Sequence, residues 1–372
     1  LASHKVPARV TGAQVTPRLV RYHLTTPLWV KLKLVTALTE ELALSLGASS
    51  CRVYRQEGQV QLEVPRSDGQ VIRLQEVCQR LAGQGAHGGG VPRGHVPAAV
   101  PPVTAVLGLD GEGAPLLLRL PSPNVAHVLI AGTTGSGKTA LARTMVASLA
   151  MFNSQRQLQV VLVDPKGRGL ACFVGLPHLL VPVVKRVEEA KAVLARLVAE
   201  MERRDGEGRS EPRLVVVLDE LADLVQVGGR EMEGLVRRLT QRGREAGVHV
   251  VGCTQKPAAS VIGGLVKSNF PVRIVGRVVS PEDAKVATGL ARTGAERLQG
   301  EGDFVVVARG QVTRMQAAYL GVVEVEAMLA RLHAATTLQS RPQLLAGTGT
   351  VGLNHGPVSL AGRLRAQLRR VK

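Results

Sequence analysis

Eight residues, Gly-Thr-Thr-Gly-Ser-Gly-Lys-Thr, match in full the Walker A pattern of a phosphate-binding loop. Its glycines allow backbone angles that turn several N–H groups toward one point and let phosphate oxygens approach closely. We expect Lys138 to reach the β- and γ-phosphates and the Thr139 hydroxyl to bind Mg²⁺, so the motif predicts ATP and Mg²⁺ as cofactors. A glycine-rich turn between a strand and a helix is the alternative. The expected nucleotide contacts are Gly132, Thr133, Thr134, Gly135, Ser136, Gly137, Lys138 and Thr139.

Two further strand ends offer the polar groups that such a loop needs. The run "RLVVVLDE" ends in Asp219 and Glu220. We expect Asp219 to join the metal shell and Glu220 to polarise the attacking water, which favours hydrolysis. The run "VHVVGCTQKP" brings Gln255 to a strand end, where it could sense the γ-phosphate or orient water. The plainer alternatives are a helix cap for the acidic pair and a polar turn for Gln255. The catalytic set is therefore Lys138, Asp219, Glu220 and Gln255.

The elements that must position these residues alternate between strand and helix from His127 to about Gly321. The strands are near-continuous apolar runs, which indicates strands covered on both faces, as in a parallel sheet flanked by helices. The fold class is therefore α/β with a largely parallel central sheet. The runs are "HVLIAG", "LQVVLVD", "RLVVVLDE", "VHVVGCTQ", "VRIVGRVV" and "DFVVVAR".

The rest of the chain divides by composition. Residues 1–81 predict a small α+β domain: strand alternation leads into a helix that ends at Gly47, and a β meander follows, with turns at Glu57-Gly58 and Asp68-Gly69. Residues 82–102 are a Gly/Pro linker. Residues 103–321 form the main domain, which opens with a hairpin turning at Asp110-Gly111. Residues 322–372 predict a basic tail with little structure beyond a weak helix at 358–371.

The formal net charge of +18 favours a polyanionic partner, such as nucleic acid or an acidic membrane. Both ends contribute, because residues 1–39 and 327–372 hold basic side chains and no acid. A generally arginine-rich composition with solvated faces is the alternative. The four cysteines lack metal-ligand spacing and predict thiols in a reducing compartment. No apolar run predicts a membrane span or a signal peptide, so we expect a cytoplasmic protein, although an anchor upstream of Leu1 stays open.

In order and spacing, residues 127–310 resemble the motor region of the FtsK/SpoIIIE family of double-stranded DNA translocases. The resemblance is carried by "HVLIAGTTGSGKT", "VVLVDPKGRGL", "GLPHLLVPVV", "EMERRD", "VVVLDELADLV", "RGREAGVHVVGCTQKP", "VIGGLVKSNFPVRIVGRVVS" and "GEGDFVVVARG". Residues 11–81 also look like the small α domain that precedes the RecA-like domain in these motors. The resemblance implies a RecA-like P-loop ATPase that forms a ring, commonly a hexamer, around double-stranded DNA, with ATP between neighbouring subunits.

The same resemblance implies an arginine that acts on the ATP of a neighbouring subunit. It falls on Arg244 in "RGREAGVH", where the guanidinium would stabilise charge that develops on the γ-phosphoryl oxygens. Arg237, Arg238 and Arg242 are rival candidates on the same helix. A solvated basic helix face is the alternative for all of them.

The family's DNA contacts, carried over by segment, fall on Lys256, Lys267 and Lys285. Lysine suits a grip on phosphates that does not read base sequence. Each of these could equally be an ordinary surface residue, and Arg273 is expected to pair within the fold.

The chain departs from full-length family members, since it shows neither their membrane anchor nor a winged-helix module. Two other functions of the same motor therefore stay open: transfer of plasmid or phage DNA, and protein secretion. A non-catalytic DNA clamp is a further alternative, against which the intact motifs speak.

Overall fold

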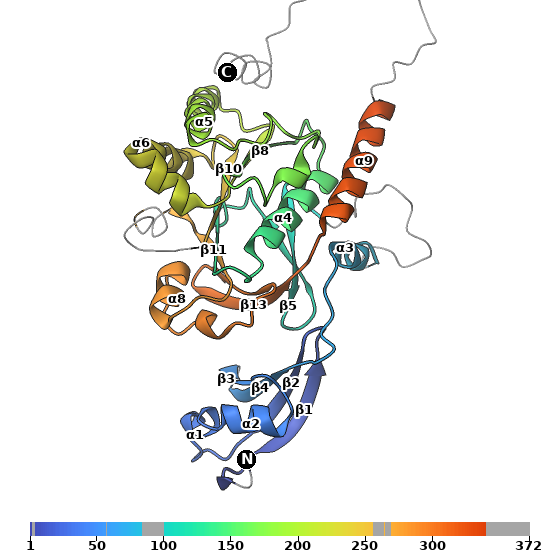
Figure 1. Ribbon diagram of the computed structural model, residues 1–372, viewed down its shortest axis with the longest axis vertical. Helices are drawn as coiled ribbons and strands as arrows, with labels where there is room; N and C mark the ends of the chain where they lie inside the picture. Colours follow the sequence, from blue (N-terminus) through green and yellow to red (C-terminus); the bar gives the residue numbers. More distant parts are fainter. Residues whose placement is uncertain (2–3, 57, 84–99, 256–263, 265–268, 340–372) are drawn as a thin grey trace, which may run out of the picture. The chain divides into compact units, whose positions relative to one another are not determined.

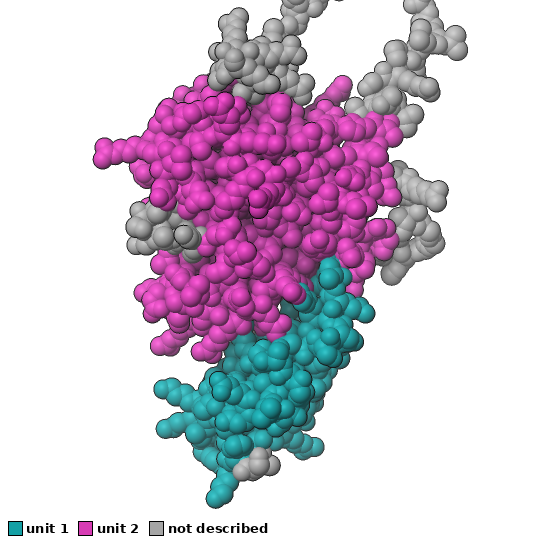
Figure 2. All heavy atoms as spheres, in the orientation of Figure 1, with its two compact units in different colours: residues 1–72, 111–113 teal, residues 73–110, 114–372 magenta. Residues whose placement is uncertain are grey.

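The computed structural model describes residues 1–372 except 2–3, 57, 84–99, 256–263, 265–268 and 340–372. The chain forms two compact units, shown in separate colours in Figure 2. The first comprises residues 1–72 and 111–113, and the second comprises residues 73–110 and 114–372.

The first unit is a small α+β structure, as predicted. Its described strands form one antiparallel sheet in the order β1-β2-β4-β3. Two short helices connect β2 to β3, and Gly47 follows them at φ +63°, a left-handed conformation that commonly ends a helix. The elements are β1 Arg9–Val15, β2 Leu19–Thr25, α1 Leu32–Thr36, α2 Thr39–Ser45, β3 Arg52–Gln56 and β4 Gln59–Pro65.

The expected meander is shorter than predicted. Residues 74–83 form helix α3 (Leu74–Gly83), not a further strand, and α3 groups with the second unit although the sequence placed it in the small domain. Its buried side chains Leu74, Val77 and Leu81 recur every three or four residues. That spacing is the helical period, which outweighs the short polar–apolar alternation just before it.

The second unit is built on one sheet whose nine described strands follow the order β6-β5-β13-β12-β11-β7-β10-β9-β8. All six apolar runs of the sequence are strands of this sheet, and the predicted hairpin is β5 and β6. The strands are β5 Thr104–Asp110, β6 Pro115–Arg119, β7 Val128–Ala131, β8 Leu158–Val163, β9 Arg213–Leu218, β10 Val248–Thr254, β11 Val272–Val275, β12 Asp303–Ala308 and β13 Gln311–Ala317.

Only part of this sheet is parallel. Strands β8, β9, β10, β7 and β11 run in one direction, whereas β12, β13, β5 and β6 pair antiparallel. The apolar run of β12 marks burial on both faces, and burial does not set strand direction. The tight turn at Arg309-Gly310, with φ +53° and +75°, instead makes β12 and β13 a hairpin.

Helices cover both faces of the sheet (Figure 1). Helices α5 and α6 pack against each other and share a core with alternate residues of the parallel strands, such as Leu129 and Ala131. Val128 and Ile130, which point the other way, are equally buried. Helix α4 packs against β5 and α9. The helices are α4 Lys138–Phe152, α5 Val187–Glu207, α6 Leu221–Arg242, α8 Pro281–Thr288, α9 Val322–Gln339, and the 3₁₀ turns Ala171–Phe173 and Ala295–Arg297.

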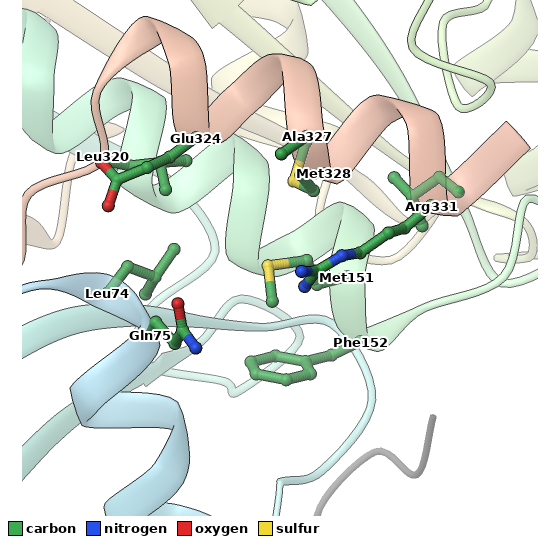
Figure 3. A pocket seen from close by; sticks show the side chains of 10 residues that line it. Leu74, Gln75, Met151, Phe152, Leu320, Glu324, Ala327, Met328 and Arg331 are labelled. Atoms are coloured by element: carbon green, nitrogen blue, oxygen red, sulfur yellow. The ribbon is translucent and has the colours of Figure 1, made fainter. Parts of the chain in front are cut away.

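Helix α9 corrects the prediction of little structure after residue 321. Val325, Met328 and Leu329 are buried and have the spacing of an amphipathic helix, a signal that the basic composition of the tail obscured. A cavity of about 410 Å³ lies between α3, the C-terminal end of α4 and α9 (Figure 3). The weak helix predicted at 358–371 lies outside the described residues.

Within the described part of the chain, no helix combines the length and the apolar character that crossing a membrane requires.

Candidate nucleotide-binding site

The Walker A residues form the connection between β7 and α4, as predicted. Gly132, Gly135 and Gly137 have φ of +150°, +81° and +97°, which side chains rarely adopt. A Cβ atom at Gly132 would lie 2.7 Å from the Ser136 Oγ atom, so the loop closes tightly on itself. The Ser136 hydroxyl is buried and has no hydrogen-bond partner among the described residues. The loop therefore has the backbone shape and the free polar atom of a phosphate cradle.

Neighbouring strand ends brace this loop from one side. In the turn before β12, the N–H groups of Glu301 and Gly302 donate to the carbonyls of Gly135 and Ser136, each at 2.9 Å. After β11, the Arg277 carbonyl accepts the Thr133 N–H at 2.8 Å and its hydroxyl at 3.0 Å. The segment after β11 and the turn before β12 thus hold the phosphate loop in place.

Lys138 begins α4 and is 6% exposed. Its Nζ atom donates to the Thr133 carbonyl at 3.4 Å, inside the loop. Burial lowers the pKa of Lys138, and the nearby carboxylates of Glu220 and Asp219 act in the opposite direction. A buried ammonium group facing the loop is the arrangement that binds phosphate oxygens.

Thr139, Asp219 and Gly169 meet at one point beside the loop. A Cβ atom at Gly169 would lie 2.8 Å from Asp219 Oδ2 and 2.9 Å from the Thr139 Cγ2 atom. A hydroxyl and a carboxylate beside a phosphate loop are the protein oxygens that Mg²⁺ accepts in such sites. The residues present therefore fit the predicted metal. Burial, followed by repulsion from Glu220 and Asp164, raises the pKa of Asp219 to about 6.

Asp164, which follows β8 and is fully buried, was not among the predicted site residues. Its Oδ1 atom accepts the Gly167 N–H at 2.9 Å, and its Oδ2 atom accepts the N–H groups of Gly169 and Leu170, both at 2.8 Å. These bonds fold residues 164–170 so that Gly169 lies against the proposed metal ligands. The signal was available, because the apolar run "LQVVLVD" ends in an acid, as "RLVVVLDE" does.

Glu220 and Gln255 lie together, as their positions at neighbouring strand ends predicted. Gln255 donates through Nε2 to Glu220 Oε1, and its own Oε1 accepts the Thr134 hydroxyl at 3.0 Å. Lys166 Nζ donates to the same Glu220 oxygen at 2.7 Å, and this hydrogen bond raises the pKa of Lys166. Lys166 lies in the quoted "DPKG" segment but was not among the predicted site residues.

Arg244 lies far from the phosphate loop of its own chain. Helix α6 starts next to Glu220, after the end of β9, and is interrupted at Gly229, where φ is +66°. It leads to Gly247, whose carbonyl accepts the N–H of Leu214 at the start of β9, so the far end of α6 lies at the opposite edge of the sheet. At the far end, Arg244 is exposed, donates to the Pro123 carbonyl at 3.0 Å and pairs with Glu245. The rival arginines pair with carboxylates of α5 or α6: Arg237 with Glu233, Arg238 with Glu202 and Arg242 with Asp205.

Of the three lysines predicted to contact DNA, only Lys285 is described. It is exposed on α8. Lys256 and Lys267 lie outside the described residues. Arg273 is half-buried, which lowers its pKa, and it donates to the Phe270 carbonyl at 3.3 Å, in line with a role within the fold.

Comparison with family models agrees with the motifs and the fold. The model of the FtsK/SpoIIIE family matches residues 94–207 and 204–259. The model described as FtsK alpha domain matches residues 1–66. The two models thus match the two units in the order in which they occur in the chain.

Curated relatives match over most of this chain. A protein of Staphylococcus epidermidis named "DNA translocase FtsK" is 31% identical over 357 residues, which covers 88% of this chain and 42% of the relative. A protein of the same name from Mycobacterium tuberculosis is 31% identical over 385 residues, covering 94% of this chain and 44% of the relative. The chain therefore spans less than half the length of these relatives.

Two solved structures share the fold. The pCW3 conjugation coupling protein TcpA, in its monomer form with ATPγS, has a TM-score of 0.59 at 19% identity and covers 89% of this chain and 96% of its own. The cytoplasmic domain of the type VII secretion ATPase EccC from Thermomonospora curvata has a TM-score of 0.54 at 27% identity. That match covers 62% of this chain and 31% of the EccC chain.

Proposed function

Because the chain belongs to the FtsK/SpoIIIE family, we propose that it is an ATPase that moves along double-stranded DNA as a ring of identical subunits, expected to be a hexamer. The observation that carries the proposal is the convergence of Lys138, Asp219 and Glu220 on a phosphate loop, in a chain whose relatives are named DNA translocases. The relatives are more than twice as long, so their activity as whole proteins comes to this chain as a proposal.

In the proposed mechanism, each side chain has one task. The loop amides and Lys138 bind the β- and γ-phosphates of ATP, and Thr139 and Asp219 hold Mg²⁺. Bound Mg²⁺ neutralises negative charge on the phosphate oxygens. Glu220 accepts a proton from the attacking water while Gln255 fixes the orientation of its carboxylate.

A ring is supported by the position of Arg244. Within one chain it lies at the opposite end of α6 from Glu220, so it cannot complete the site of its own subunit. In a ring, the far end of α6 of one copy can face the phosphate loop of the next. Its guanidinium would then stabilise the charge on the transferred phosphoryl group. Closing and reopening of this subunit boundary would move the DNA-contacting segments.

DNA as the partner is supported by charge. The net charge of +18 creates a field that attracts a polyanion, and lysine contacts to phosphates bind DNA of any sequence. We propose Lys285, together with Lys256 and Lys267, as contacts to the DNA backbone.

The test is the steady-state ATPase rate with and without long duplex DNA, on a sample whose mass in solution is measured at the same time. We expect DNA to stimulate hydrolysis several-fold and to coincide with ring formation. A Lys138→Ala variant is the control for contaminating ATPases. A protein that stays a single chain with DNA and nucleotide present and hydrolyses no ATP would contradict the proposal.

The likeness to EccC favours one second candidate, a motor that moves protein. It predicts an ATPase that is stimulated by a peptide and is indifferent to DNA. The strong positive charge speaks against it, because a peptide substrate does not require such a field. The same ATPase measurement, with DNA absent, separates the two candidates.

A further inference from the structure

Four side chains form a continuous hydrogen-bonded chain across the edge of the sheet that carries the site. Thr134 bonds to Gln255, Gln255 to Glu220, and Glu220 to Lys166. These residues follow β7, β10, β9 and β8, which are adjacent in that order in the sheet. This series of hydrogen bonds therefore spans four adjacent strands, from the phosphate loop after β7 to Lys166 after β8.

Both donors to Glu220 bond the same carboxylate oxygen. Lys166 Nζ lies 2.7 Å from Oε1, and Gln255 donates to that atom from the opposite neighbouring strand. A carboxylate held at one oxygen by two donors cannot rotate freely, and its second oxygen has a fixed direction. A general base must lie within hydrogen-bond reach of the proton that it accepts, so this direction decides whether Glu220 can work.

The backbone that carries Lys166 is itself fixed. The Gly167 N–H donates to the Asp164 carbonyl at 3.1 Å, which closes a turn with Pro165 and Lys166 at its centre. Proline in second position and glycine in fourth are typical of such turns. The Asp164 carboxylate binds the same turn from the inside. Lys166 is thus presented to Glu220 by a rigid support, while its side chain stays 51% exposed.

We propose that Lys166 is a positioning residue that holds the Glu220 carboxylate in the orientation needed to accept the proton of the attacking water. The inference rests on the proposed ATPase function. Lys166 acts through Glu220 and touches no reacting atom. Its second ion pair, with Asp223 Oδ2 at 3.8 Å, is longer and its partner is more exposed, so the contact to Glu220 is the one that matters.

The experiment compares Lys166→Met with Lys166→Arg in the full chain, with ATPase kinetics in the presence of DNA and with binding of ATPγS. We expect Lys166→Met to lower kcat by about tenfold or more, since small misplacements of catalytic groups have effects of this size. KM and the Kd for ATPγS should change less than about twofold. Lys166→Arg keeps a charged donor and should restore part of the rate.

Two control variants separate positioning from a general loss of structure. Lys191→Met removes a lysine of α5 that pairs with Glu188 and Glu231 away from the site, and it should hydrolyse ATP at the wild-type rate. Asp223→Asn removes the second partner of Lys166 and should leave at least about half of the activity. The melting temperatures of all variants are measured alongside.

The decisive measurement repeats Lys166→Met in a Glu220→Gln background, under single-turnover conditions. If Lys166 acts through Glu220, the second substitution should change the residual rate less than about twofold. An equal loss in both backgrounds, or wild-type kcat in Lys166→Met, would overturn the proposal while the ATPase function stands. A wild-type protein without Lys138-dependent hydrolysis would overturn both.

Discussion

The Asp164 carboxylate accepts the backbone N–H of Gly169 at 2.8 Å, and this bond holds Gly169 against the side chains that face the proposed metal position. Position 169 therefore has no room for a side chain. Asp164 and Gly169 thus together shape the proposed metal position, although neither belongs to the phosphate loop.

We expect Gly169→Ala to weaken binding of Mg²⁺–ATP. The new Cβ atom would lie within 3 Å of both Asp219 Oδ2 and Thr139 Cγ2, so one of these ligands must move. A loss of roughly tenfold or more in affinity corresponds to disturbing one ligand contact. Titration with a fluorescent ATP analogue at several Mg²⁺ concentrations measures this affinity. Gly206→Ala is the matched control, because open space surrounds that glycine. Unchanged affinity in Gly169→Ala would contradict the assigned metal position.

Lys138→Ala should remove ATP turnover and lower nucleotide affinity by about 10- to 100-fold, since a charge-assisted hydrogen bond to phosphate is lost. Isothermal titration with ATPγS and a steady-state assay measure the two effects. The variant leaves Asp219 and Glu220 in place without the nearby lysine, so its melting temperature is measured alongside. Retained hydrolysis would mean that the activity does not arise at this loop.

Arg244→Ala should bind ATP with wild-type affinity and lose nearly all turnover in the presence of DNA, because its proposed partner is the phosphate of a neighbouring copy. Arg242→Ala serves as the control, since Arg242 pairs with Asp205 on α5. Normal hydrolysis by Arg244→Ala with DNA present would exclude Arg244 as the arginine that acts between subunits. Loss of turnover in Arg242→Ala alone would transfer the role to that residue.

Stability should fall on acidification because of two buried histidines. Burial, and to a lesser extent repulsion from His249, lowers the pKa of His127 to about 3. Burial lowers the pKa of His249 to about 4, and the positive charge of Arg213 acts in the same direction. Unfolded histidine binds a proton below about pH 6.5 and the folded protein does not. Stability is therefore complete above pH 6.5 and is lost as the pH falls toward 4, by about 2 kcal/mol per histidine between pH 7 and 5.

Urea unfolding at pH 7 and pH 5 measures this loss. His127 Nδ1 accepts the Val250 N–H at 3.0 Å, so His127→Asn offers an acceptor in its place and should reduce the pH dependence by about half. An unchanged pH dependence in that variant would place its origin elsewhere.

Lys285→Ala should weaken DNA binding by a similar factor on any sequence and lower the slope of log affinity against log salt by about 1. Fluorescence anisotropy with two unrelated duplexes over a salt series tests this. Lys185→Ala is a control of the same type on another part of the surface. A sequence-dependent loss, or none, would argue against a backbone contact at Lys285.

Much of the site could be predicted because it follows from local patterns. Glycine spacing marked the phosphate loop, and apolar runs marked the strands whose ends bring Asp219, Glu220 and Gln255 to one edge of the sheet. What the sequence does not contain is the pairing order. Without knowing that β8 lies beside β9, nothing indicates that Lys166 reaches Glu220 or that Gly169 lies against Asp219.

Two features of the fold, the direction of β12 and the presence of α9, were also not predicted from the sequence. An apolar run reports burial and not direction, so the antiparallel pairing of β12 within the largely parallel sheet that was predicted could not be inferred from it. Helix α9 was missed for a different reason: its apolar spacing was readable, but the basic composition of residues 327–372 suggested a tail for the whole stretch after residue 321. Arg244 remains a prediction, because its proposed partner belongs to another copy of the chain.

The two hydrogen bonds from the turn before β12 to the carbonyls of Gly135 and Ser136 bear on how such a motor could work. A phosphate loop that is hydrogen-bonded to its own sheet keeps its conformation when the nucleotide leaves. We therefore expect a change in the shape of the loop to contribute little to movement. In the proposed ring, the movement would then originate at the boundary between neighbouring subunits, where no such hydrogen bonds within one chain hold the two sides together.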